Sequence, residues 1–437
     1  MSYASRVKIG DIQKHIGEQV QVCGFVQAIR DQKLRQFVIL SDRSGRIQIF
    51  HEKRGGDDNL AVVISSLTQE SAVSVTGLVL KNEAVRLGGI EIIAESVTLE
   101  SMAMSPLPLQ SDSSRELQLD WRQISLRSPR NQLIFEVQTA LEAAMRQFWL
   151  SHGFIEIHSP KIMGSASESG AELFSLPYFG GTAYLAQSPQ FYKQMAMAGG
   201  LERVFEIGPV FRANPSFTSR HDTEFTSIDM EISWIDSHED VMYWEEQLLQ
   251  KAIQDVRSAY GDRIQKEFGI QIAVPILPFP RITLAQAKEI IARRGHQISP
   301  NDDLDPLGER LLSQYVEETY GHQFVFVTDY PAAVRAFYHM RYEDRPNITK
   351  SFDLLWKGLE VTTGAQREHR FEILERQTLE KGLTLEPLRH YLNFFRYGCP
   401  PHGGFGLGLT RLLMVLLGVE GVRDVTFLYR GPNRITP

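Results

Sequence analysis

Alternation of apolar and polar side chains is the strongest pattern in the first hundred residues of this 437-residue chain. Five runs show it, at residues 19–26, 36–41, 46–51, 72–80 and 89–99. A period of two is typical of a strand with one buried face. Between the third and fourth runs, Leu60, Val63, Ile64 and Leu67 recur at helical spacing. Three strands, a helix and two strands is the order of a five-stranded OB barrel, so residues 1–104 are predicted to form an OB-fold β-barrel.

Turn-forming residues interrupt the pattern after the barrel. Ser-Pro, Leu-Pro and Ser-Asp-Ser-Ser occur between residues 101 and 131, and no apolar period persists there. We therefore expect a hinge or linker over residues 105–131. Beyond it, residues 133–150 carry apolar side chains three and four apart, which predicts an amphipathic helix ending before Gly153. The remainder, to residue 437, mixes helical and strand-like runs without a repeat, which favours one α+β domain over residues 132–437.

Charge and cysteine content limit the function classes. The chain has 46 basic and 53 acidic side chains, a net charge of −7, which excludes a generally polycationic nucleic-acid coat protein. Residues 1–50 nevertheless hold eight basic against four acidic side chains. Two cysteines provide no disulfide framework, the N-terminal residues lack a signal-peptide core, and apolar runs fall far short of the roughly 20 residues that span a bilayer. We expect a cytoplasmic protein with no membrane partner.

Two segments carry features of an anion-binding site. Residues 402–408 are rich in glycine and lead into an apolar helix with one arginine, Arg411, although close backbone packing explains the glycines equally well. Residues 204–231 form two apolar runs around a polar loop with Arg212 and Arg220 at its edges and Phe225 after it. Such a hairpin could hold a polyphosphate and stack a base, and the alternative is a surface hairpin with solvated charges.

A third segment combines carboxylates with an arginine. Asp353 and Glu360 are seven residues apart, and Arg367 follows after seven more, a spacing that suits a strand-turn-strand layout. Carboxylate oxygens are ligands that Mg²⁺ prefers. Structural ion pairing explains the same residues, and spacing alone does not separate the two interpretations.

Together these segments resemble a known enzyme family. Pro160 after the amphipathic helix, the hairpin with Phe211-Arg212, and the glycine-rich run leading to Arg411 resemble, in order, the three signature motifs of class II aminoacyl-tRNA synthetases. A preceding OB barrel is similar to subclass IIb, which contains the aspartate, asparagine and lysine enzymes. The whole chain looks most like the compact archaeal-type aspartyl-tRNA synthetases. The resemblance implies an antiparallel-sheet catalytic domain and ATP-dependent ligation of L-aspartate to tRNA(Asp) through an aspartyl-adenylate.

The resemblance also implies which residues bind aspartate. Residues 187–193 resemble the substrate segment of the aspartate enzymes, in which the lysine, here Lys193, faces the substrate side chain; asparagine enzymes lack it. Lys193 and Arg367 would bind the β-carboxylate, and Asp229 would orient Lys193. Glu168, in a loop that closes over the amino acid, would attract the α-ammonium group. The expected aspartate-binding set is Glu168, Ser188, Gln190, Lys193, Asp229 and Arg367.

For ATP, the resemblance assigns further residues. Arg212, Arg411 and Glu360 are the expected catalytic residues, with Arg212 bridging the α-phosphate and the attacking carboxylate. The expected ATP-binding set is Arg212, Arg220, His221, Phe225, Glu360, Gly406, Gly408 and Arg411. Phe225 would stack on adenine, and His221 and Arg411 would bind the terminal phosphate. The expected Mg²⁺ ligands are Asp353, Glu360 and Thr363.

In the barrel, Phe37, Gln48 and Arg30 match the family's anticodon-binding residues, although Phe37 lies in an apolar run where a core aromatic is the simpler interpretation. The partners implied are tRNA(Asp), L-aspartate and a second copy of the chain. Whether tRNA(Asn) is also charged stays open, because Gln27 replaces the aromatic residue by which the family discriminates between them. That replacement slightly favours relaxed recognition.

Three departures from the family pattern leave alternatives open. Asn214 replaces the usual glutamate two residues after Arg212, residues 32–34 lack a common glycine, and residues 429–434 differ from the usual tail. The alternatives are an asparagine-specific ligase, which Lys193 and Asp229 oppose, and a paralogue that binds tRNA or a ligand, or amidates a substrate, without charging tRNA. Retention of the ATP-binding and anticodon-binding residues opposes the second alternative.

Overall fold

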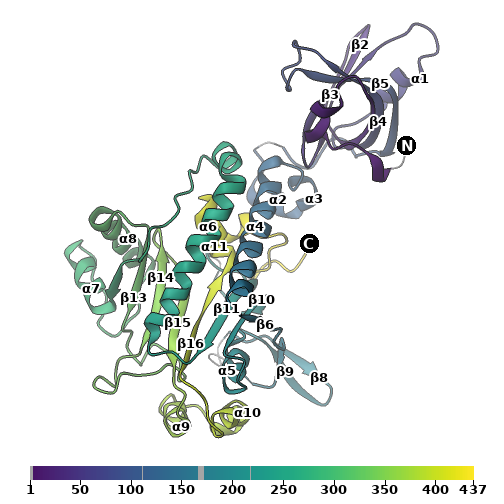
Figure 1. The fold of residues 1–437 in the computed structure, drawn as a ribbon. Helices are drawn as coiled ribbons and strands as arrows, with labels where there is room; N and C mark the ends of the chain where they lie inside the picture. Colours follow the sequence, from purple (N-terminus) through teal and green to yellow (C-terminus); the bar gives the residue numbers. More distant parts are fainter. Residues whose placement is uncertain (1–2, 111, 166–171, 217) are drawn as a thin grey trace. The chain divides into compact units, whose positions relative to one another are not determined.

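The computed structural model describes residues 3–110, 112–165, 172–216 and 218–437, and the chain divides into two compact units, Met1–Gln132 and Leu133–Pro437. The first unit holds a closed barrel with strand order β1-β2-β3-β5-β4 (Figure 1). Its elements are β1 (Gln19–Asp31), β2 (Arg35–Asp42), β3 (Gly45–Glu52), α1 (Asn59–Ser66), β4 (Ala72–Lys81) and β5 (Ile90–Ser101), after the short 3-10 helices Tyr3–Ser5 and Ile9–His15. All five predicted strands and the predicted helix are present in this order.

Alternation determines which barrel side chains are buried. In β2, Val38 and Leu40 are buried in the core, whereas the alternate residues Phe37 and Ile39 are only partly buried. The core interpretation of Phe37 is therefore wrong. Its ring instead lies 5.4 Å, centroid to centroid, from the ring of Phe50 on the neighbouring strand.

The predicted linker is more ordered than its composition indicates. It contains two short helices, α2 (Arg115–Asp120) and α3 (Arg122–Ser125). The Ser114 hydroxyl accepts a hydrogen bond from the backbone N–H of Leu117 at 3.3 Å and so caps the start of α2. A serine that looks like a turn former in the sequence thus acts as a helix cap.

A mixed eight-stranded sheet, with order β12-β13-β14-β15-β16-β11-β10-β6, organises the second unit. Its strands are β6 (Ile155–Glu156), β10 (Arg203–Phe211), β11 (Glu224–Ser233), β12 (Arg281–Thr283), β13 (Phe324–Thr328), β14 (Ser351–Trp356), β15 (Leu359–Arg367) and β16 (His402–Gly408). The six inner strands are antiparallel, and only the edge pairs β12 with β13 and β6 with β10 are parallel. A separate small sheet has the order β7-β9-β8. Its strands are β7 (Ile162–Met163), β8 (Ser175–Tyr178) and β9 (Gly181–Leu185).

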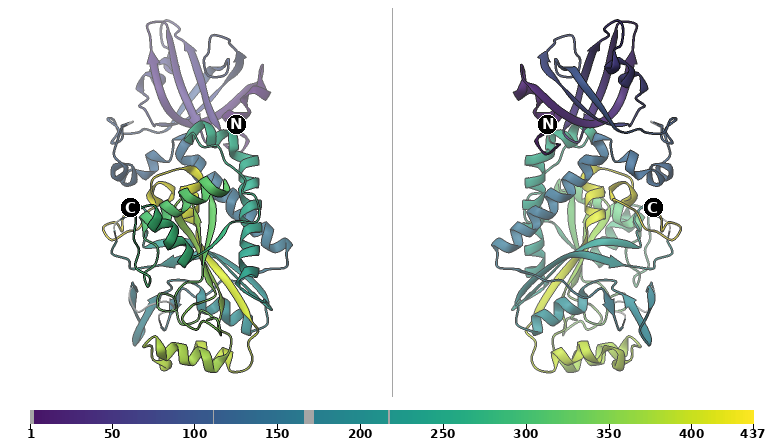
Figure 2. Two further views of the ribbon diagram at one scale, coloured as in Figure 1. Left: turned by 90° about the vertical axis from the view of Figure 1, so that its left-hand side faces the viewer. Right: turned by 90° about the vertical axis from the view of Figure 1, so that its right-hand side faces the viewer.

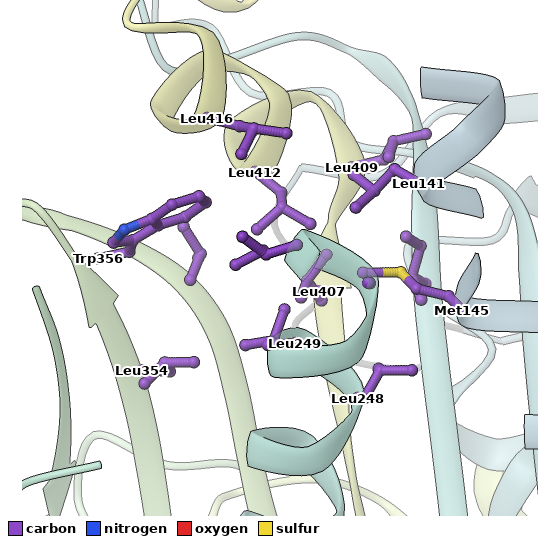
Figure 3. Packing of buried hydrophobic residues seen from close by; sticks show 14 of the residues in the cluster. Leu141, Met145, Leu248, Leu249, Leu354, Trp356, Leu407, Leu409, Leu412 and Leu416 are labelled. Atoms are coloured by element: carbon purple, nitrogen blue, oxygen red, sulfur yellow. The ribbon is translucent and has the colours of Figure 1, made fainter. Parts of the chain in front are cut away.

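Helices α4 (Pro129–Ser151), α6 (His238–Phe268) and α11 (Leu409–Leu417) cover one face of this sheet and form the main core with it (Figures 1 and 2). Figure 3 shows Leu141 of α4, Leu248 of α6 and Leu412 of α11 converging on Leu407 of β16. The apolar stripe of α4 is therefore buried within its own unit. Its pattern gives no independent support to a dimer interface.

The remaining helices are α5 (Gln190–Ala198), α7 (Leu284–Arg293), α8 (Pro306–Tyr320), α9 (Phe371–Glu380), α10 (Leu385–Phe395) and α12 (Val422–Val425). Helix α5 contacts β10 and β11, and α7 and α8 pack beside β12 and β13. Among the described residues, no helix has both the length and the apolar character needed to cross a membrane.

Candidate active site

A cavity of about 360 Å³ lies in the second unit, over β11, β16 and β15. Most of the residues predicted for the aspartate and ATP sites line it: Ser188, Gln190, Arg212, Arg220, His221, Phe225, Asp229, Glu360, Thr363, Arg367, Gly406, Gly408 and Arg411. Lys193 and Asp353 are not in the lining, and both side chains lie just behind it. Glu168 lies outside the described residues.

The alternation of β11 and β16 makes room for charged groups on the cavity face. Met230 of β11 and Phe405 of β16 point into the helix-covered core, so Asp229 and Glu231 point to the opposite face. Opposite them stand Gly406 and Gly404. A Cβ atom at Gly404 would lie 2.2 Å from a Glu231 carboxylate oxygen, and one at Gly406 would lie 3.0 Å from Asp229 Oδ1. A Cβ at Gly404 would also lie 2.0 Å from the Met230 carbonyl oxygen, so Gly404 is required by the backbone and by Glu231, while Gly406 gives Asp229 room.

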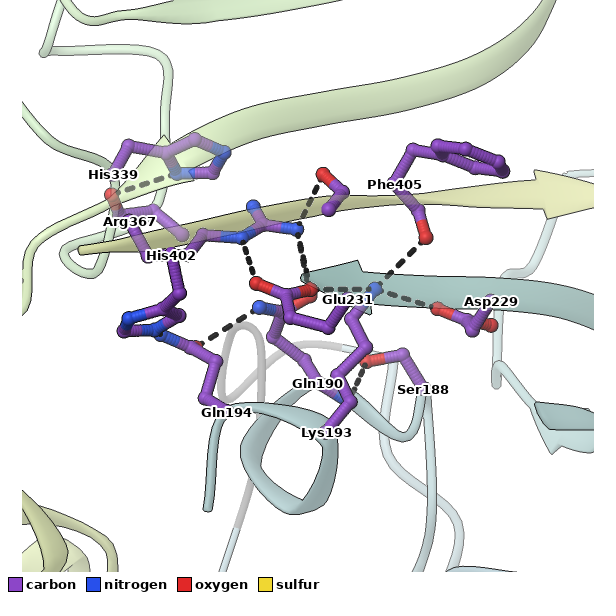
Figure 4. A network of polar contacts seen from close by, with 12 residues as sticks. Ser188, Gln190, Lys193, Gln194, Asp229, Glu231, His339, Arg367, His402 and Phe405 are labelled. Atoms are coloured by element: carbon purple, nitrogen blue, oxygen red, sulfur yellow. Dashed lines mark hydrogen bonds and ion pairs between the residues drawn. The ribbon is translucent and has the colours of Figure 1, made fainter. Parts of the chain in front are cut away.

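Two cations and two carboxylates form a buried cluster at this point (Figure 4). Lys193 Nζ, from α5, donates to Asp229 Oδ1 at 2.9 Å and to the Phe405 carbonyl at 2.9 Å, and lies 3.4 Å from Glu231 Oε2. Arg367 Nε, from β15, donates to Glu231 Oε1 at 2.9 Å. The formal charges of these four side chains cancel. The geometry is that expected if Asp229 orients Lys193, but the cluster is neutral rather than net positive.

Neutral polar side chains extend the cluster. Arg367 also donates to Gln190 Oε1 at 3.3 Å, and Gln190 Nε2 donates to Gln194 Oε1 at 2.9 Å. Gln194 Nε2 lies 3.1 Å from His402 Nε2 (Figure 4). Burial lowers the pKa of His402 to about 4 despite the opposing effect of Glu231, so this imidazole is neutral near pH 7. The network fixes the orientation of Gln190, which lines the cavity.

The other end of the cavity is lined by arginines from two elements. The Arg212 guanidinium carbon lies 5.4 Å from the centroid of the Phe225 ring on the adjacent strand. Arg411, in the first turn of α11, donates to the Glu360 carbonyl at 3.1 Å and lies 3.6 Å from the Glu360 carboxylate. Burial and then the Arg411 charge lower the pKa of His221. An aromatic face beside several cations is an arrangement suited to a nucleotide.

Carboxylates on β14 and β15 define the expected metal site. The two strands form the predicted strand-turn-strand layout, in which Asp353 stands opposite Thr363. Asp353 Oδ2 accepts from Arg335 at 2.5 Å, whereas Asp353 Oδ1 is buried and accepts no hydrogen bond from the described residues. The Thr363 hydroxyl donates to Glu360 at 3.2 Å. Burial and then the Asp353 charge raise the pKa of Glu360, whereas the Arg411 and Arg335 charges lower it.

These donors fit Mg²⁺. The described residues contain no ready cluster of three or more acidic, histidine or cysteine ligands. Mg²⁺, however, is commonly held by one or two carboxylates together with phosphate oxygens and water. A buried carboxylate oxygen without a partner on Asp353, beside Glu360, matches that donor set.

Several charged residues at the cavity were not predicted from the sequence. Glu231 pairs with both buried cations, Lys193 and Arg367. The sequence could have indicated this, because residues two apart on a strand, such as Asp229 and Glu231, lie on the same face. Asp222 lines the cavity, and burial raises its pKa to about 6. Arg335 and Glu309 pair with Asp353 and Arg220, contacts for which the sequence offers no spacing pattern.

The three predicted anticodon-binding residues share the outer face of the barrel. Phe37 of β2 is in register with Arg30 of β1 and with Phe50 of β3. Gln48, two residues before Phe50, lies on the same side, and its amide nitrogen donates to Glu91 at 2.8 Å. The amide oxygen of Gln48 is thus oriented away from Glu91, on a face with an exposed cation and a partly exposed aromatic ring.

Residues that depart from the expected pattern have local roles. Asn214 lines the cavity, and its Oδ1 accepts from the backbone N–H of Ser216 at 2.8 Å, which stabilises the loop locally. Gln27 donates to Glu70 at 3.0 Å, and Arg127 also pairs with Glu70, at 3.0 Å. The Gln27 amide nitrogen is therefore engaged within the first unit.

Comparisons with known proteins agree with this geometry. Residues 114–430 match the family model described as tRNA synthetases class II (D, K and N), and residues 20–100 match the OB-fold nucleic acid binding domain. An aspartate–tRNA(Asp/Asn) ligase of Aeropyrum pernix is 41% identical over 97% of this chain and 96% of its own length. An aspartate–tRNA(Asp) ligase of Pyrococcus abyssi is 42% identical over 96% of this chain and 97% of its own. The asparaginyl-tRNA synthetase of Pyrococcus horikoshii, solved with asparaginyl-adenylate, is similar with a TM-score of 0.92 at 31% identity, covering 99% of both chains.

Proposed function

Because the chain belongs to the class II tRNA synthetases of the D, K and N group, with an N-terminal OB-fold domain, we propose that it ligates L-aspartate to tRNA(Asp) through an aspartyl-adenylate. The observation that carries the choice of amino acid is the buried Lys193–Asp229 pair at the cavity wall. Lys193 neutralises Asp229, and Arg367, which Glu231 and Gln190 hold in place, lines the cavity, where it would donate to the substrate β-carboxylate. The ligases of Aeropyrum pernix and Pyrococcus abyssi support the same substrate.

In the first step of this proposal, an oxygen of the aspartate α-carboxylate attacks the α-phosphorus of ATP in line, and pyrophosphate leaves. Arg212 binds the α-phosphate and the attacking carboxylate together, while Phe225 stacks on adenine. His221 and Arg411 bind the terminal phosphate. Catalysis then depends on positioning and charge neutralisation, without a covalent enzyme intermediate.

Asp353, Glu360 and Thr363 would hold Mg²⁺ in this proposal. The ion, when bound, neutralises charge on the phosphates. Before binding, Arg335 holds one Asp353 oxygen and Thr363 holds one Glu360 oxygen, so both carboxylates are already oriented.

In the second step, the 3′-hydroxyl of the terminal adenosine of the tRNA attacks the mixed anhydride and releases AMP. The barrel face with Arg30, Phe37 and Gln48 would bind the anticodon by stacking and hydrogen bonding. We extend the proposal to tRNA(Asn), because Gln27 offers no aromatic ring and its amide nitrogen is bound to Glu70. The Aeropyrum pernix relative, whose name includes both tRNAs, supports this extension.

Asparagine is the second candidate substrate, favoured by the similarity to the asparaginyl-tRNA synthetase. One experiment separates the two. Pyrophosphate exchange into ATP is measured with aspartate or asparagine, and charging is then measured on purified tRNA(Asp) and tRNA(Asn). We expect exchange with aspartate and charging of both tRNAs. Exchange with asparagine alone would refute the amino acid assignment, and the absence of charging on either tRNA would favour a paralogue with another activity.

A further inference from the structure

Arg220 is held by a carboxylate outside the predicted site. It lies in the loop between β10 and β11 and lines the cavity. Its guanidinium donates to Glu309 Oε2 at 2.8 Å. Glu309 belongs to the first turn of α8, 89 residues away in the chain, and only 9% of its side chain is exposed. The pair therefore joins the hairpin loop to α8 at the margin of the cavity.

The surroundings of Glu309 are those of an anion site. Arg220 and Arg411 favour its charged form, while burial and the Glu360 carboxylate oppose it. Burial, the largest of these effects, raises the pKa of Glu309 to about 7. A carboxylate in such a place is stabilised mainly by the arginines around it, which are also the groups that a phosphate would use. Glu309 Oε2 takes an Nη1 donor of Arg220 and neutralises its charge, so a phosphate would compete with Glu309 for that donor and for that charge.

We propose that Glu309 is an internal competitor for Arg220: it holds Nη1 and neutralises the charge of the guanidinium, and it yields both to the terminal phosphate of a bound polyphosphate. This inference rests on the proposed function, because it takes the arginine end of the cavity as the polyphosphate site. Glu309 is then a positioning residue that holds Arg220 at the cavity and lowers the affinity for ATP and pyrophosphate. Weaker binding of pyrophosphate speeds its release after the first step.

The direct test is Glu309→Gln, which keeps the shape and removes the charge. Calorimetric titration with inorganic pyrophosphate, and separately with ATP, should show binding about threefold to fivefold tighter, the upper part of the range expected for such an ion pair. The KM for ATP in the exchange reaction should fall in parallel, and the KM for aspartate should stay unchanged. Glu317→Gln, the same change at an exposed position of α8, is the matched control and should alter none of these values.

A double-mutant cycle tests whether the effect passes through Arg220. In an Arg220→Gln background, Glu309→Gln should tighten pyrophosphate binding by less than about twofold, because no guanidinium remains to be released. Equal gains in both backgrounds would overturn the competition and leave only general repulsion. Weaker or unchanged binding in Glu309→Gln alone would overturn it as well.

If Glu309→Gln does not fold, Glu309→Asp gives the same test, since its shorter side chain withdraws the carboxylate from Arg220. Tighter pyrophosphate binding in Glu309→Asp supports the proposal, and unchanged or weaker binding overturns it. Pyrophosphate binding is measured without any amino acid. Failure of aspartate-dependent exchange in the unmodified protein would therefore count against the proposed function, not against the competition for Arg220.

Discussion

Replacement of Lys193 by methionine tests how the buried cluster serves both folding and substrate choice. The change leaves Asp229 and Glu231 buried with Arg367 as their remaining cation, so the cluster goes from neutral to a charge of −1. Breaking a buried ion pair by removing one partner costs about 3–5 kcal/mol. We expect the unfolding midpoint of the second unit to fall by roughly 5–8 °C, because about 2.1 cal/mol/K of unfolding entropy per residue makes a unit of this size respond weakly.

A second substitution separates stability from binding. Lys193→Met combined with Asp229→Asn restores a neutral cluster, so most of the lost stability should return. The double variant still lacks the ammonium group behind the cavity wall. Losing one charge-assisted interaction costs about 1.5–3 kcal/mol, which raises the KM for aspartate roughly 10- to 150-fold. The KM for ATP should change less than about twofold, because the arginines that would bind it are intact.

The assay is aspartate-dependent exchange of pyrophosphate into ATP, with chemical unfolding measured on the same samples. Lys161→Met is the matched control, since Lys161 donates to the buried Glu206 at 2.7 Å but does not line the cavity. It should lower stability and leave the KM for aspartate unchanged. A folded double variant with the aspartate KM of the unmodified protein would refute the assignment of Lys193 to the substrate carboxylate.

Three other predictions follow from the structure. Phe37→Ala should weaken tRNA charging by about 1–3 kcal/mol per lost base stack and leave adenylate formation unchanged; a parallel loss of exchange would show damage to the fold. Sedimentation at micromolar concentration should give about twice the 49.7 kDa chain mass, and a fully active monomer would contradict the predicted homodimer. Burial, reinforced by the Glu246 and Asp353 carboxylates, raises the pKa of Glu245 to about 8, so the folded state holds this proton more tightly than the unfolded state. The Glu245 contribution to stability should then be lost as pH rises from about 4.5 to about 8, at up to about 1.4 kcal/mol per pH unit. The measurement is the free energy of unfolding in urea at several pH values in this range. Glu245→Gln should flatten the dependence of that free energy on pH.

Local patterns were sufficient to predict the barrel and the main helix. Strands β1 to β5 show the period of two along their own residues, and α4 shows the helical period, so each element carries its own signal. The linker does not follow its local pattern. Ser114 is a turn former in isolation and a helix cap in the structure, because capping depends on the backbone that follows it.

Contacts between distant segments leave no periodic signal, and the site depends on such contacts. Lys193 and Asp229 are 36 residues apart, and their pairing is implied by resemblance to a family rather than by spacing. Arg220 and Glu309 are 89 residues apart, and neither residue is unusual where it stands. Glu231 is the exception, since its position two residues after Asp229 on a strand already places both carboxylates on one face.

The neutral charge of the cluster changes how an acidic substrate would be selected. Asp229 lines the cavity and would repel a β-carboxylate, whereas the amide of asparagine could donate to it. Lys193 reduces that repulsion by holding Asp229 Oδ1, and its charge acts together with that of Arg367, itself paired with Glu231, on the substrate carboxylate. In the Lys193→Met variant, Asp229 is again an uncompensated acceptor. The exchange activity with aspartate should therefore fall more than the exchange activity with asparagine. A ratio of the two exchange activities equal to that of the unmodified protein would show that Lys193 contributes to stability alone.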